Sequence, residues 1–380
     1  MNDSFEAHFH RRAELRSSAG GRVNLLGEHT DYHEGFVFPA AIDLRTVALA
    51  APRGDRRVRI RSENVGDTLE VSLDDLAPWE EVTWRSYVAG PLWALEREGH
   101  GLRGADVLLT SNVPFGGGLS SSASVQVCLV GAAAAWSGVS LSAQEVARIA
   151  RKAENWFCHV PCGVMDQMAS ACGRADHAIL LDCRSMAMEA VPVPASVAIV
   201  VADSGVRHAL AGSEYEKRQA ECASGMRKLR ARHPGLKAAR DLTMDVLEAE
   251  RALLTDVEYR RLRHVVTEDD RVIEARKAFS EGDVAGAGRL LWGSHRSLAG
   301  DYEVSCAELD LLVEIAAGVR GVLGARLTGA GFGGNTVNLV EAARASDVAA
   351  DLVERYAART GRRTAATVVR PSAGVEVTRL

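Results

Sequence analysis

The sequence predicts a protein of two domains in which helices and strands are mixed. The chain has 380 residues, which is more than one domain usually holds and suggests two or three domains. Segments typical of strands and of helices follow one another along the whole chain, which favours an α+β or an α/β fold. Apolar residues make up 47% of the sequence, enough to bury a large core without disulfides or metals.

The clearest patterns of the first half surround a loop rich in glycine and serine. Val58–Ser62 and Thr68–Leu73 alternate between apolar and polar residues and predict two strands of a hairpin or a meander. Ala105–Thr110 predicts a strand that enters the loop, and Ser121–Trp136, rich in alanine, valine and leucine, predicts a buried helix that leaves it. A capping box at residues 142–145 (SAQE) begins a further helix.

The second half predicts a long helix between two groups of strands. One helical face carries Tyr215, Gln219, Cys222, Met226 and Leu229. Strands are expected at Ala178–Leu181, Val197–Ala202, Ala325–Thr328 and Thr336–Val340, and a second helix at Cys306–Ala317. Lys228–Arg240 is the most loop-like interior stretch. Prolines cluster over Met186–Val197, which places the domain boundary there and gives domains of residues 1–190 and 191–380.

The charge balance and the cysteines exclude several classes of protein. With 45 basic and 50 acidic residues, the net charge of −5 argues against binding to nucleic acid or to an anionic membrane. The N-terminus lacks the apolar segment of a secretory signal, and the apolar stretch Val127–Trp136 is too short to cross a bilayer. Seven cysteines without a CxxC pair are typical of reduced, buried thiols, so we expect a cytoplasmic protein.

The loop Val113–Ser124 (VPFGGGLSSSAS) has the composition of a phosphate-binding loop. Its three glycines allow the backbone to approach a ligand closely, and its serines add hydroxyl donors. Because the loop opens a helix, free N–H groups and the positive end of the helix dipole would face an anion. The Gly-Lys-Ser/Thr of a Walker A loop is absent, and an ordinary flexible turn is the alternative interpretation.

A second cluster lies in Gly21–Gly35 (GRVNLLGEHTDYHEG). Its charged and polar side chains, Arg22, Glu28, His29 and Asp31, are suited to the hydroxyls of a sugar, since a carboxylate accepts from several O–H groups at once. A solvated loop with a surface ion pair explains the same residues equally well.

Two further features gain weight only in combination with these. Residues 326–340 (RLTGAGFGGNTVNLV) place a glycine-rich turn between two strands, which suits either close approach to a ligand or a plain tight turn. Glu154 ends the helix that begins at Ser142, and Asp166 follows the Pro161–Gly163 turn. One of these carboxylates is suited to Mg²⁺ and the other to an acceptor hydroxyl, although carboxylates this close often occur by chance.

Together these segments resemble the galactokinase branch of the GHMP small-molecule kinases. GRVNLLGEHTDYHEGFVFPAAI is similar to the galactokinase signature, VPFGGGLSSSAS to the family's phosphate loop, and LTGAGFGGNTVNLV to its third motif. PCGVMDQ and GSEYEKRQAEC help to extend the likeness over nearly the whole chain. The resemblance implies a two-domain α+β architecture, with a ribosomal-S5-like N-terminal domain, a ferredoxin-like C-terminal domain and the active site in the cleft between them.

The same resemblance implies phosphorylation of galactose at the C1 hydroxyl by ATP, the first step of galactose catabolism by the Leloir route. Arg22 resembles the residue that stabilises charge near the transferred phosphoryl group, and Asp166 the carboxylate beside the C1 hydroxyl. Ser122 and Glu154 resemble the Mg²⁺ ligands. The sugar ligands implied are Glu28, His29, Thr30, Asp31, Gly163 and Tyr215, and the nucleotide loop is Gly116, Gly117, Gly118, Leu119, Ser120, Ser121 and Ser122. We expect a monomer whose only partners are galactose and ATP.

The chain departs from the family pattern at three places, and two other interpretations stay open. Gly20 stands where a proline is usual, Ala330 where some members have glycine, and Asn335 where cysteine is common. The alternatives are a related kinase for N-acetylgalactosamine or another sugar, and a catalytically silent sensor of sugar and ATP. The intact serine run with Arg22 and Asp166 argues against the sensor, because binding alone does not require all of these residues.

Overall fold

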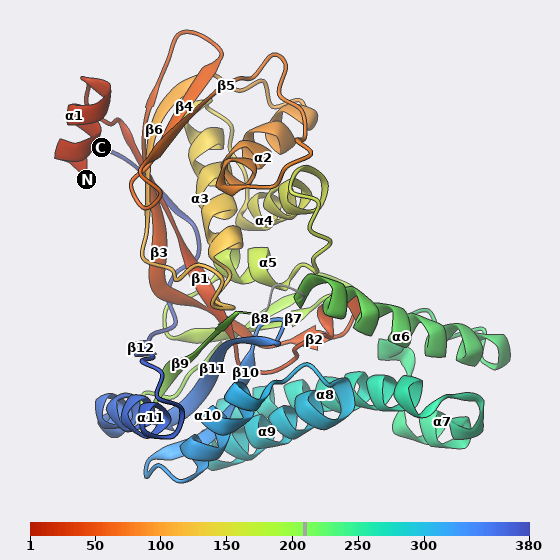
Figure 1. The fold of residues 1–380 in the computed structure, drawn as a ribbon. Helices are drawn as coiled ribbons and strands as arrows, with labels where there is room; N and C mark the ends of the chain where they lie inside the picture. The colour runs from red at the N-terminus through yellow and green to blue at the C-terminus, as the bar shows by residue number, and fades with distance from the viewer. Residues whose placement is uncertain (208–210) are drawn as a thin grey trace.

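Two sheets, one in each lobe, organise the molecule (Figure 1). The computed structural model describes residues 1–207 and 211–380. Its larger sheet has six strands in the order β13-β1-β3-β6-β4-β5, and the sheet of the other lobe has four in the order β10-β11-β9-β12. A small sheet of β2, β7 and β8 lies near the junction of the lobes (Figure 1). Strand pairing is antiparallel except between β4 and β6, so the α+β prediction is confirmed.

The six-stranded sheet packs its helices against one face. Its strands are β1 (Leu15–Asn24), β3 (Pro39–Pro52), β4 (Arg57–Ser62), β5 (Asp67–Ser72), β6 (Ala105–Ser111) and β13 (Glu376–Arg379). The covering helices are α2 (Trp84–Arg97), α3 (Ser121–Trp136), α4 (Ala143–Lys152) and α5 (Met165–Cys172), while α1 (Asn2–Phe9) lies on the opposite face (Figure 1). Helix α3 is apolar on nearly every side and is buried on nearly every side, which makes it the centre of this core.

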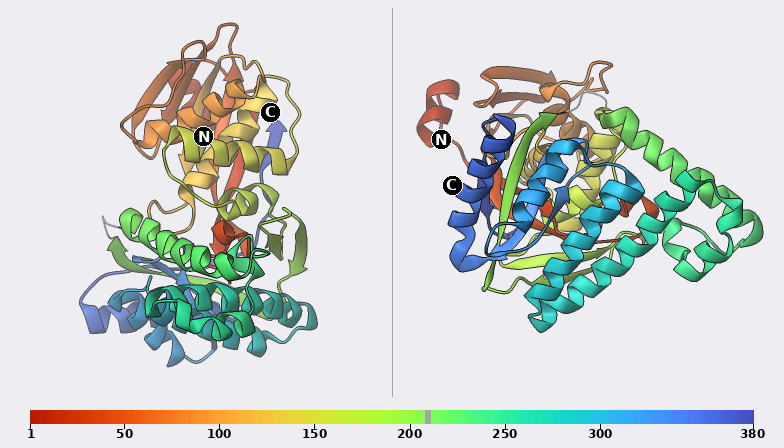
Figure 2. Two further views of the ribbon diagram at one scale, coloured as in Figure 1. Left: turned by 90° about the vertical axis from the view of Figure 1, so that its right-hand side faces the viewer. Right: turned by 60° about the horizontal axis from the view of Figure 1, so that its bottom comes forward.

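The four-stranded sheet carries the second core. Its strands are β9 (Val197–Arg207), β10 (Val322–Thr328), β11 (Gly333–Glu341) and β12 (Ala366–Val369). The helices α8 (Asp256–Glu281), α9 (Val284–Ser297), α10 (Ala307–Ala317) and α11 (Ala345–Thr360) pack beneath it, and α6 (Ala211–Arg232) and α7 (Met244–Ala249) extend to one side (Figure 2). The junction sheet consists of β2 (Phe36–Val37), β7 (His177–Asp182) and β8 (Met188–Pro192).

Both ends of the chain belong to the first lobe. Strand β13 pairs with β1 at the edge of the six-stranded sheet. Arg45 on β3 secures the segment that leads to it, because its guanidinium donates to the carbonyl oxygens of Ala373 and Gly374 at 2.7 Å each. The chain therefore passes from the first lobe to the second and returns, and the division into residues 1–190 and 191–380 stays a prediction.

Most predicted elements are present. The hairpin is formed by β4 and β5, the expected helix Ser121–Trp136 is α3, and the Ser142–Glu145 capping box has both of its hydrogen bonds. The strands and helices predicted in the second half correspond to β7, β9, β10, β11, α6 and α10. No helix in the described part of the chain is both long and apolar enough to cross a membrane.

Two expectations were wrong in detail. The stretch 228–240 is not a loop at its start, because α6 continues through Arg232. The helix that begins after Ser142 ends at Lys152, and a π-helical turn, Ala153–Phe157, follows it and holds Glu154. Such a turn shifts the register of one helical face, which the apolar spacing of the sequence did not reveal.

Candidate active site

A cavity of about 310 Å³ brings together residues of both lobes. Of the predicted site residues, it is lined by Arg22, Glu28, His29, Asp31, Glu154, Gly163, Asp166 and Tyr215. They come from β1, the turn that follows it, the π-helical turn Ala153–Phe157, the segment before α5, α5 itself and α6. Gly329 and Ala330, in the glycine-rich turn between β10 and β11, complete the wall from the second lobe. Segments far apart in the sequence thus form one cavity lined by several charged side chains.

Arg22 and Asp166 form an ion pair at one end of this cavity. Nε and Nη2 of Arg22 lie 2.9 and 2.8 Å from Oδ1 of Asp166, and Nη1 donates to the carbonyl oxygen of Gly118 at 2.5 Å. The other carboxylate oxygen, Oδ2, accepts from the hydroxyl of Ser120 at 2.5 Å. A carboxylate oxygen accepts about two hydrogen bonds, so Oδ1 is filled and Oδ2 keeps one acceptor position.

The Asp31 carboxylate packs directly against the backbone of Gly163. A Cβ atom on Gly163 would lie 1.6 Å from Oδ2 of Asp31, so only glycine fits beside this carboxylate. Burial raises the pKa of Asp31 to about 6, and repulsion from Asp166 adds to the shift. Asp31 and Asp166 therefore repel each other, and the cavity favours a ligand that donates hydrogen bonds to both.

Both ring nitrogens of His29 have protein partners. Nε2 lies 3.2 Å from the carbonyl oxygen of Ala330, which only accepts, so Nε2 carries the proton. Burial lowers the pKa of His29 well below its ordinary value, so the ring is neutral and Nδ1 accepts from the Tyr32 hydroxyl at 2.7 Å. That hydroxyl in turn lies 2.9 Å from the hydroxyl of Tyr302. His29 thus connects the segment Gly21–Gly35, which is predicted to bind sugar, to the glycine-rich turn of the second lobe.

Thr30 does not line the cavity, in contrast to the expectation that it binds substrate. Its side chain is fully buried, and its hydroxyl contacts the carbonyl oxygens of Gly27 and Phe36 at 2.9 and 2.6 Å. The chain reverses direction between these two residues, and their carbonyl groups need a donor inside the turn. Thr30 therefore holds the turn that presents Asp31.

The predicted phosphate loop is fixed from both lobes. The backbone N–H of Arg22 donates to the carbonyl oxygen of Leu119 at 3.0 Å, and the Asn335 side chain donates to that of Gly117. Ser120 has a positive φ of 55° directly before α3, which turns the chain sharply into the helix. Carbonyl groups of the loop are thus held by protein, at the N-terminus of a sixteen-residue helix.

Arg207 is a cation beside the loop that the sequence did not identify. It ends β9 and pairs with Asp203, with Nη1–Oδ1 and Nη2–Oδ2 distances of 2.8 and 3.0 Å. Its guanidinium lies within 3.4 and 3.6 Å of the positions that Cβ atoms on Gly117 and Gly116 would take. No local pattern marks Arg207, because its proximity to the loop depends on how the two lobes meet.

Ser122 and Glu154 lie close together, as a shared metal requires. Glu154 is buried and accepts a hydrogen bond from Nε2 of Gln167 at 2.5 Å, and the nearby Ser122 hydroxyl favours its ionised form. Burial raises the pKa of Glu154 to about 7. No group of three His, Cys, Asp or Glu side chains suited to a metal occurs among the described residues. One carboxylate and one hydroxyl fit Mg²⁺, which usually keeps waters and substrate phosphates as its other ligands.

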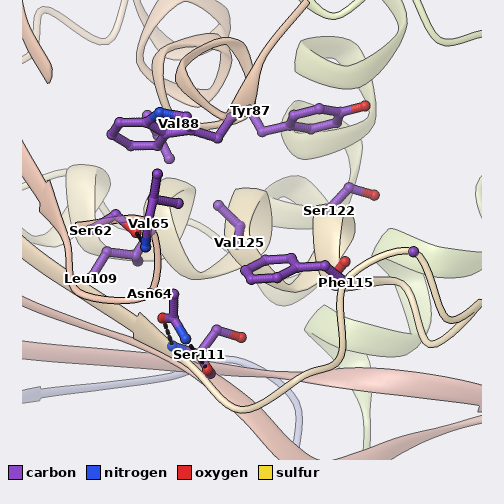
Figure 3. A pocket seen from close by; sticks show the side chains of 13 residues that line it. Ser62, Asn64, Val65, Tyr87, Val88, Leu109, Ser111, Phe115, Ser122 and Val125 are labelled. Carbon is purple, nitrogen blue, oxygen red and sulfur yellow. Dashed lines mark hydrogen bonds between the residues drawn. The ribbon is translucent and has the colours of Figure 1, made fainter. Parts of the chain in front are cut away.

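A second cavity, of about 400 Å³, adjoins the phosphate loop (Figure 3). Tyr87 of α2 and Phe115 of the loop lie on opposite sides of it, with Val125 of α3 between them (Figure 3). At its floor the Asn64 amide exchanges two hydrogen bonds, of 2.7 and 2.8 Å, with the backbone of Ser111. Its walls come from four separate segments, and for this reason the sequence did not predict it.

The comparisons with known proteins agree with this geometry. Residues 3–52 match the galactokinase galactose-binding signature, residues 86–174 the N-terminal domain of GHMP kinases, and residues 275–358 their C-terminal domain. The chain is 43% identical to a galactokinase of Roseiflexus sp. (strain RS-1), over 99% of this chain and 96% of that protein. Identity to a galactokinase of Chloroflexus aggregans is also 43%, over 98% and 95% of the two chains.

A solved structure gives the same result. The crystal structure of Lactococcus lactis galactokinase complexed with galactose superposes with a TM-score of 0.94 at 34% identity, over 99% of this chain and 98% of that one. A mevalonate kinase superposes with a TM-score of 0.68 at 16% identity, which shows the shared fold alone. The two-domain architecture expected from the sequence is confirmed, and the chain belongs to the galactokinase family of the GHMP kinases.

Proposed function

We infer that this protein phosphorylates galactose at the C1 hydroxyl with ATP, giving galactose 1-phosphate and ADP. The observation that carries this inference is the contact of Asp166 with both Arg22 and Ser120, at the point where the cavity meets the phosphate loop. A kinase needs its acceptor hydroxyl and the γ-phosphoryl group held next to each other. The full-length likeness to galactokinases supports galactose as the acceptor.

The 310 Å³ cavity is proposed as the sugar site. Asp31 and Glu28 supply carboxylate acceptors, Gly163 brings backbone beside the ring, and Tyr215 adds an aromatic wall. Carboxylates discriminate between epimers because a hydroxyl of the wrong configuration leaves a buried acceptor unpaired, at a cost of roughly 1–3 kcal/mol.

ATP is proposed to bind across the loop and the second cavity. The triphosphate would lie on the loop 116–122, where the N-terminus of α3 and the guanidinium of Arg207 favour negative charge. The adenine would lie between Tyr87 and Phe115, since a planar base suits a pocket with aromatic walls.

In the reaction, the free acceptor position on Oδ2 of Asp166 receives the hydrogen bond of the C1 hydroxyl. The hydroxyl oxygen attacks the γ-phosphorus, the bond from that phosphorus to the β-phosphate oxygen breaks, and ADP leaves. Asp166 orients the hydroxyl and takes up its proton as the new O–P bond forms. Arg22 stabilises the charge that spreads over the moving phosphoryl group.

Ser122 and Glu154 are proposed to hold Mg²⁺ through their oxygen atoms. When bound there, the ion would neutralise charge on the ATP phosphates. Glu154 is buried and forms no ion pair with a basic side chain among the described residues, which supports this assignment.

A panel of free sugars with Mg²⁺-ATP, followed by ADP release, tests the proposal. We expect galactose to give the highest kcat/KM and glucose to be a poor acceptor. A higher kcat/KM for N-acetylgalactosamine would identify the related sugar kinase, and binding of galactose and ATP without turnover would identify a sensor. We further propose that the protein is a cytoplasmic monomer. Light scattering after gel filtration measures its molar mass and so tests the oligomeric state.

A further inference from the structure

Arg326 on β10 is a fully buried arginine that connects the two lobes. Its Nε donates to the carbonyl oxygen of Leu25 at 2.8 Å, and its Nη2 donates to that of Asn24 at 2.7 Å. The same Nη2 lies 2.8 Å from Oε1 of Glu28. Arg326 does not line the sugar cavity, whereas Glu28 does. The guanidinium therefore lies behind Glu28, on the side away from the cavity.

Oε1 of Glu28 is held entirely by the end of β10 and the turn after it. Besides Arg326, it accepts from the backbone N–H of Gly329 at 2.6 Å, and the Thr328 hydroxyl lies 3.2 Å away. The two N–H donors occupy the acceptor positions of this oxygen. No donor from the described residues reaches Oε2, so Oε2 is the atom of Glu28 that remains for a ligand in the cavity.

We propose that Arg326 is a positioning residue for the reaction, which keeps Glu28 ionised and presents its Oε2 to a sugar hydroxyl. This inference rests on the proposed function. A buried carboxylate without a partner becomes neutral, and a neutral carboxyl group presents one acceptor and one donor in place of two acceptors. The glycine-rich third motif thus acts on the sugar site through Arg326, which precedes its glycines, as well as through the backbone of Gly329.

The other charged groups near this pair do not replace Arg326. Arg22 lines the same cavity as Glu28 but is bonded to Asp166. On α8, Nε2 of His264 contacts the backbone oxygen of Glu28 at 3.1 Å, and burial lowers the pKa of His264 to about 4. His264 is therefore neutral at the working pH, as is His29.

The remaining charged groups near Glu28 and Arg326 are not bonded to Glu28. Glu268 and Arg271, also on α8, pair with each other at 2.6 Å and face Arg326. Asp31 faces Glu28 within the cavity. Arg326 is thus the one cation, among the described residues, that is bonded to Glu28.

The test is the pH dependence of galactose binding by Arg326→Met, measured by calorimetry without nucleotide between pH 6.5 and 8.5. Asp31 is ionised in this range, so the unsubstituted protein should bind with a nearly constant Kd. In Arg326→Met, the buried Glu28 carboxylate loses the one cation bonded to it, which favours its neutral form. The Kd should then rise as the pH falls, by up to about tenfold per pH unit. Arg326→Lys keeps a charge and should restore most of the pH independence.

Two further variants separate this role from a loss of stability. Arg261→Met removes another fully buried arginine, one paired with Glu221 and Glu303, and should lower Tm without a pH-dependent Kd. In a Glu28→Gln background, Arg326→Met should leave the Kd unchanged, because the group through which it acts is gone. This double variant has no unpaired carboxylate and remains measurable where Arg326→Met alone does not fold.

The carboxyl carbon of Glu28 provides a readout that does not depend on the sugar. In protein labelled at glutamate side chains, its NMR signal, assigned by its loss in Glu28→Gln, should titrate between pH 6.5 and 8.5 only in Arg326→Met. A pH-independent Kd and an untitrated carboxyl in folded Arg326→Met would overturn the proposal. A titrating carboxyl in a protein that does not bind galactose would instead overturn the proposed function.

Discussion

Two guanidinium nitrogen atoms of Arg22 contact one carboxylate oxygen of Asp166, although the two residues lie 144 positions apart in the sequence. Because Arg22 also donates to the carbonyl oxygen of Gly118, the same guanidinium contacts the phosphate loop. The pair thus connects the group that would face the sugar hydroxyl to the loop that would hold the phosphates. This geometry leads to the first prediction.

Asp166→Asn should abolish most turnover while ATP still binds. The substitution keeps the size of the side chain and removes its charge, and we expect kcat to fall by about 10²–10⁴-fold. Arg22→Lys should also lower kcat, since one ammonium nitrogen cannot reproduce the geometry in which three guanidinium nitrogens contact Asp166 and Gly118. Steady-state kinetics and nucleotide binding check both. If the pair only joins two segments, both variants will lose Tm and keep near-normal kcat when folded.

Gly163→Ala should weaken galactose binding specifically. The added Cβ would lie 1.6 Å from Oδ2 of Asp31, so the carboxylate or the backbone must move. We expect the KM for galactose to rise at least tenfold, which corresponds to about 1.4 kcal/mol, while the KM for ATP changes little. Gly235→Ala is the matched control, because a Cβ at that position has no atom within 4 Å. Equal effects on both substrates would contradict the placement of Asp31 in the sugar site.

Asp31 should make galactose affinity pH-dependent. Its pKa of about 6 means that its carboxylate gains a proton as the pH falls through 6, so the KM for galactose should rise below that value. Kinetics between pH 5 and 8 at saturating ATP check this prediction.

The stability of the folded protein should depend on Asp31 in the opposite direction: protonation of Asp31 at low pH weakens galactose binding but favours the folded state. A carboxyl group whose pKa is raised by folding favours the folded state at low pH, and this contribution is lost as the pH rises towards 6. Asp31→Asn should therefore raise Tm more at pH 7.5 than at pH 4. An equal change in Tm at both values would argue against a buried, strained carboxylate.

Glu154→Gln should weaken the Mg²⁺ dependence of turnover far more than galactose binding without nucleotide. Its raised pKa also means that ionised Glu154 destabilises the metal-free protein above pH 7, so Glu154→Gln should raise Tm at pH 8. Mg²⁺ titration of the rate and thermal melting measure the two effects. Glu145→Gln, in the capping box of the preceding helix, is the control and should leave the Mg²⁺ titration unchanged.

Tyr87→Ala should raise the KM for ATP and leave the KM for galactose unchanged. The substitution removes one aromatic wall of the second cavity, and loss of stacking on a base costs roughly 1–3 kcal/mol. Comparison of ATP with inorganic tripolyphosphate as competing ligands separates base from phosphate contacts. An unchanged KM for ATP would place the base elsewhere.

Local spacing in the sequence was sufficient to predict the elements that carry the site. The glycine-serine loop before an apolar stretch identified the start of α3, the capping box identified α4, and alternation identified β4 and β5. The order of the motifs identified the family. These features depend on residues a few positions apart, where backbone preference and periodicity act directly.

Only the tertiary structure decided which residues meet. Thr30 shares a motif with Asp31, yet its hydroxyl closes the turn while the carboxylate enters the cavity. Ser120 contacts Asp166, Arg207 lies beside the phosphate loop, and Arg326 lies behind Glu28, although no short-range pattern marks any of these pairs. Such contacts follow from strand register and from the packing of the two lobes. Those are properties of the whole chain, because each depends on burying many apolar side chains at once rather than on the spacing within one segment.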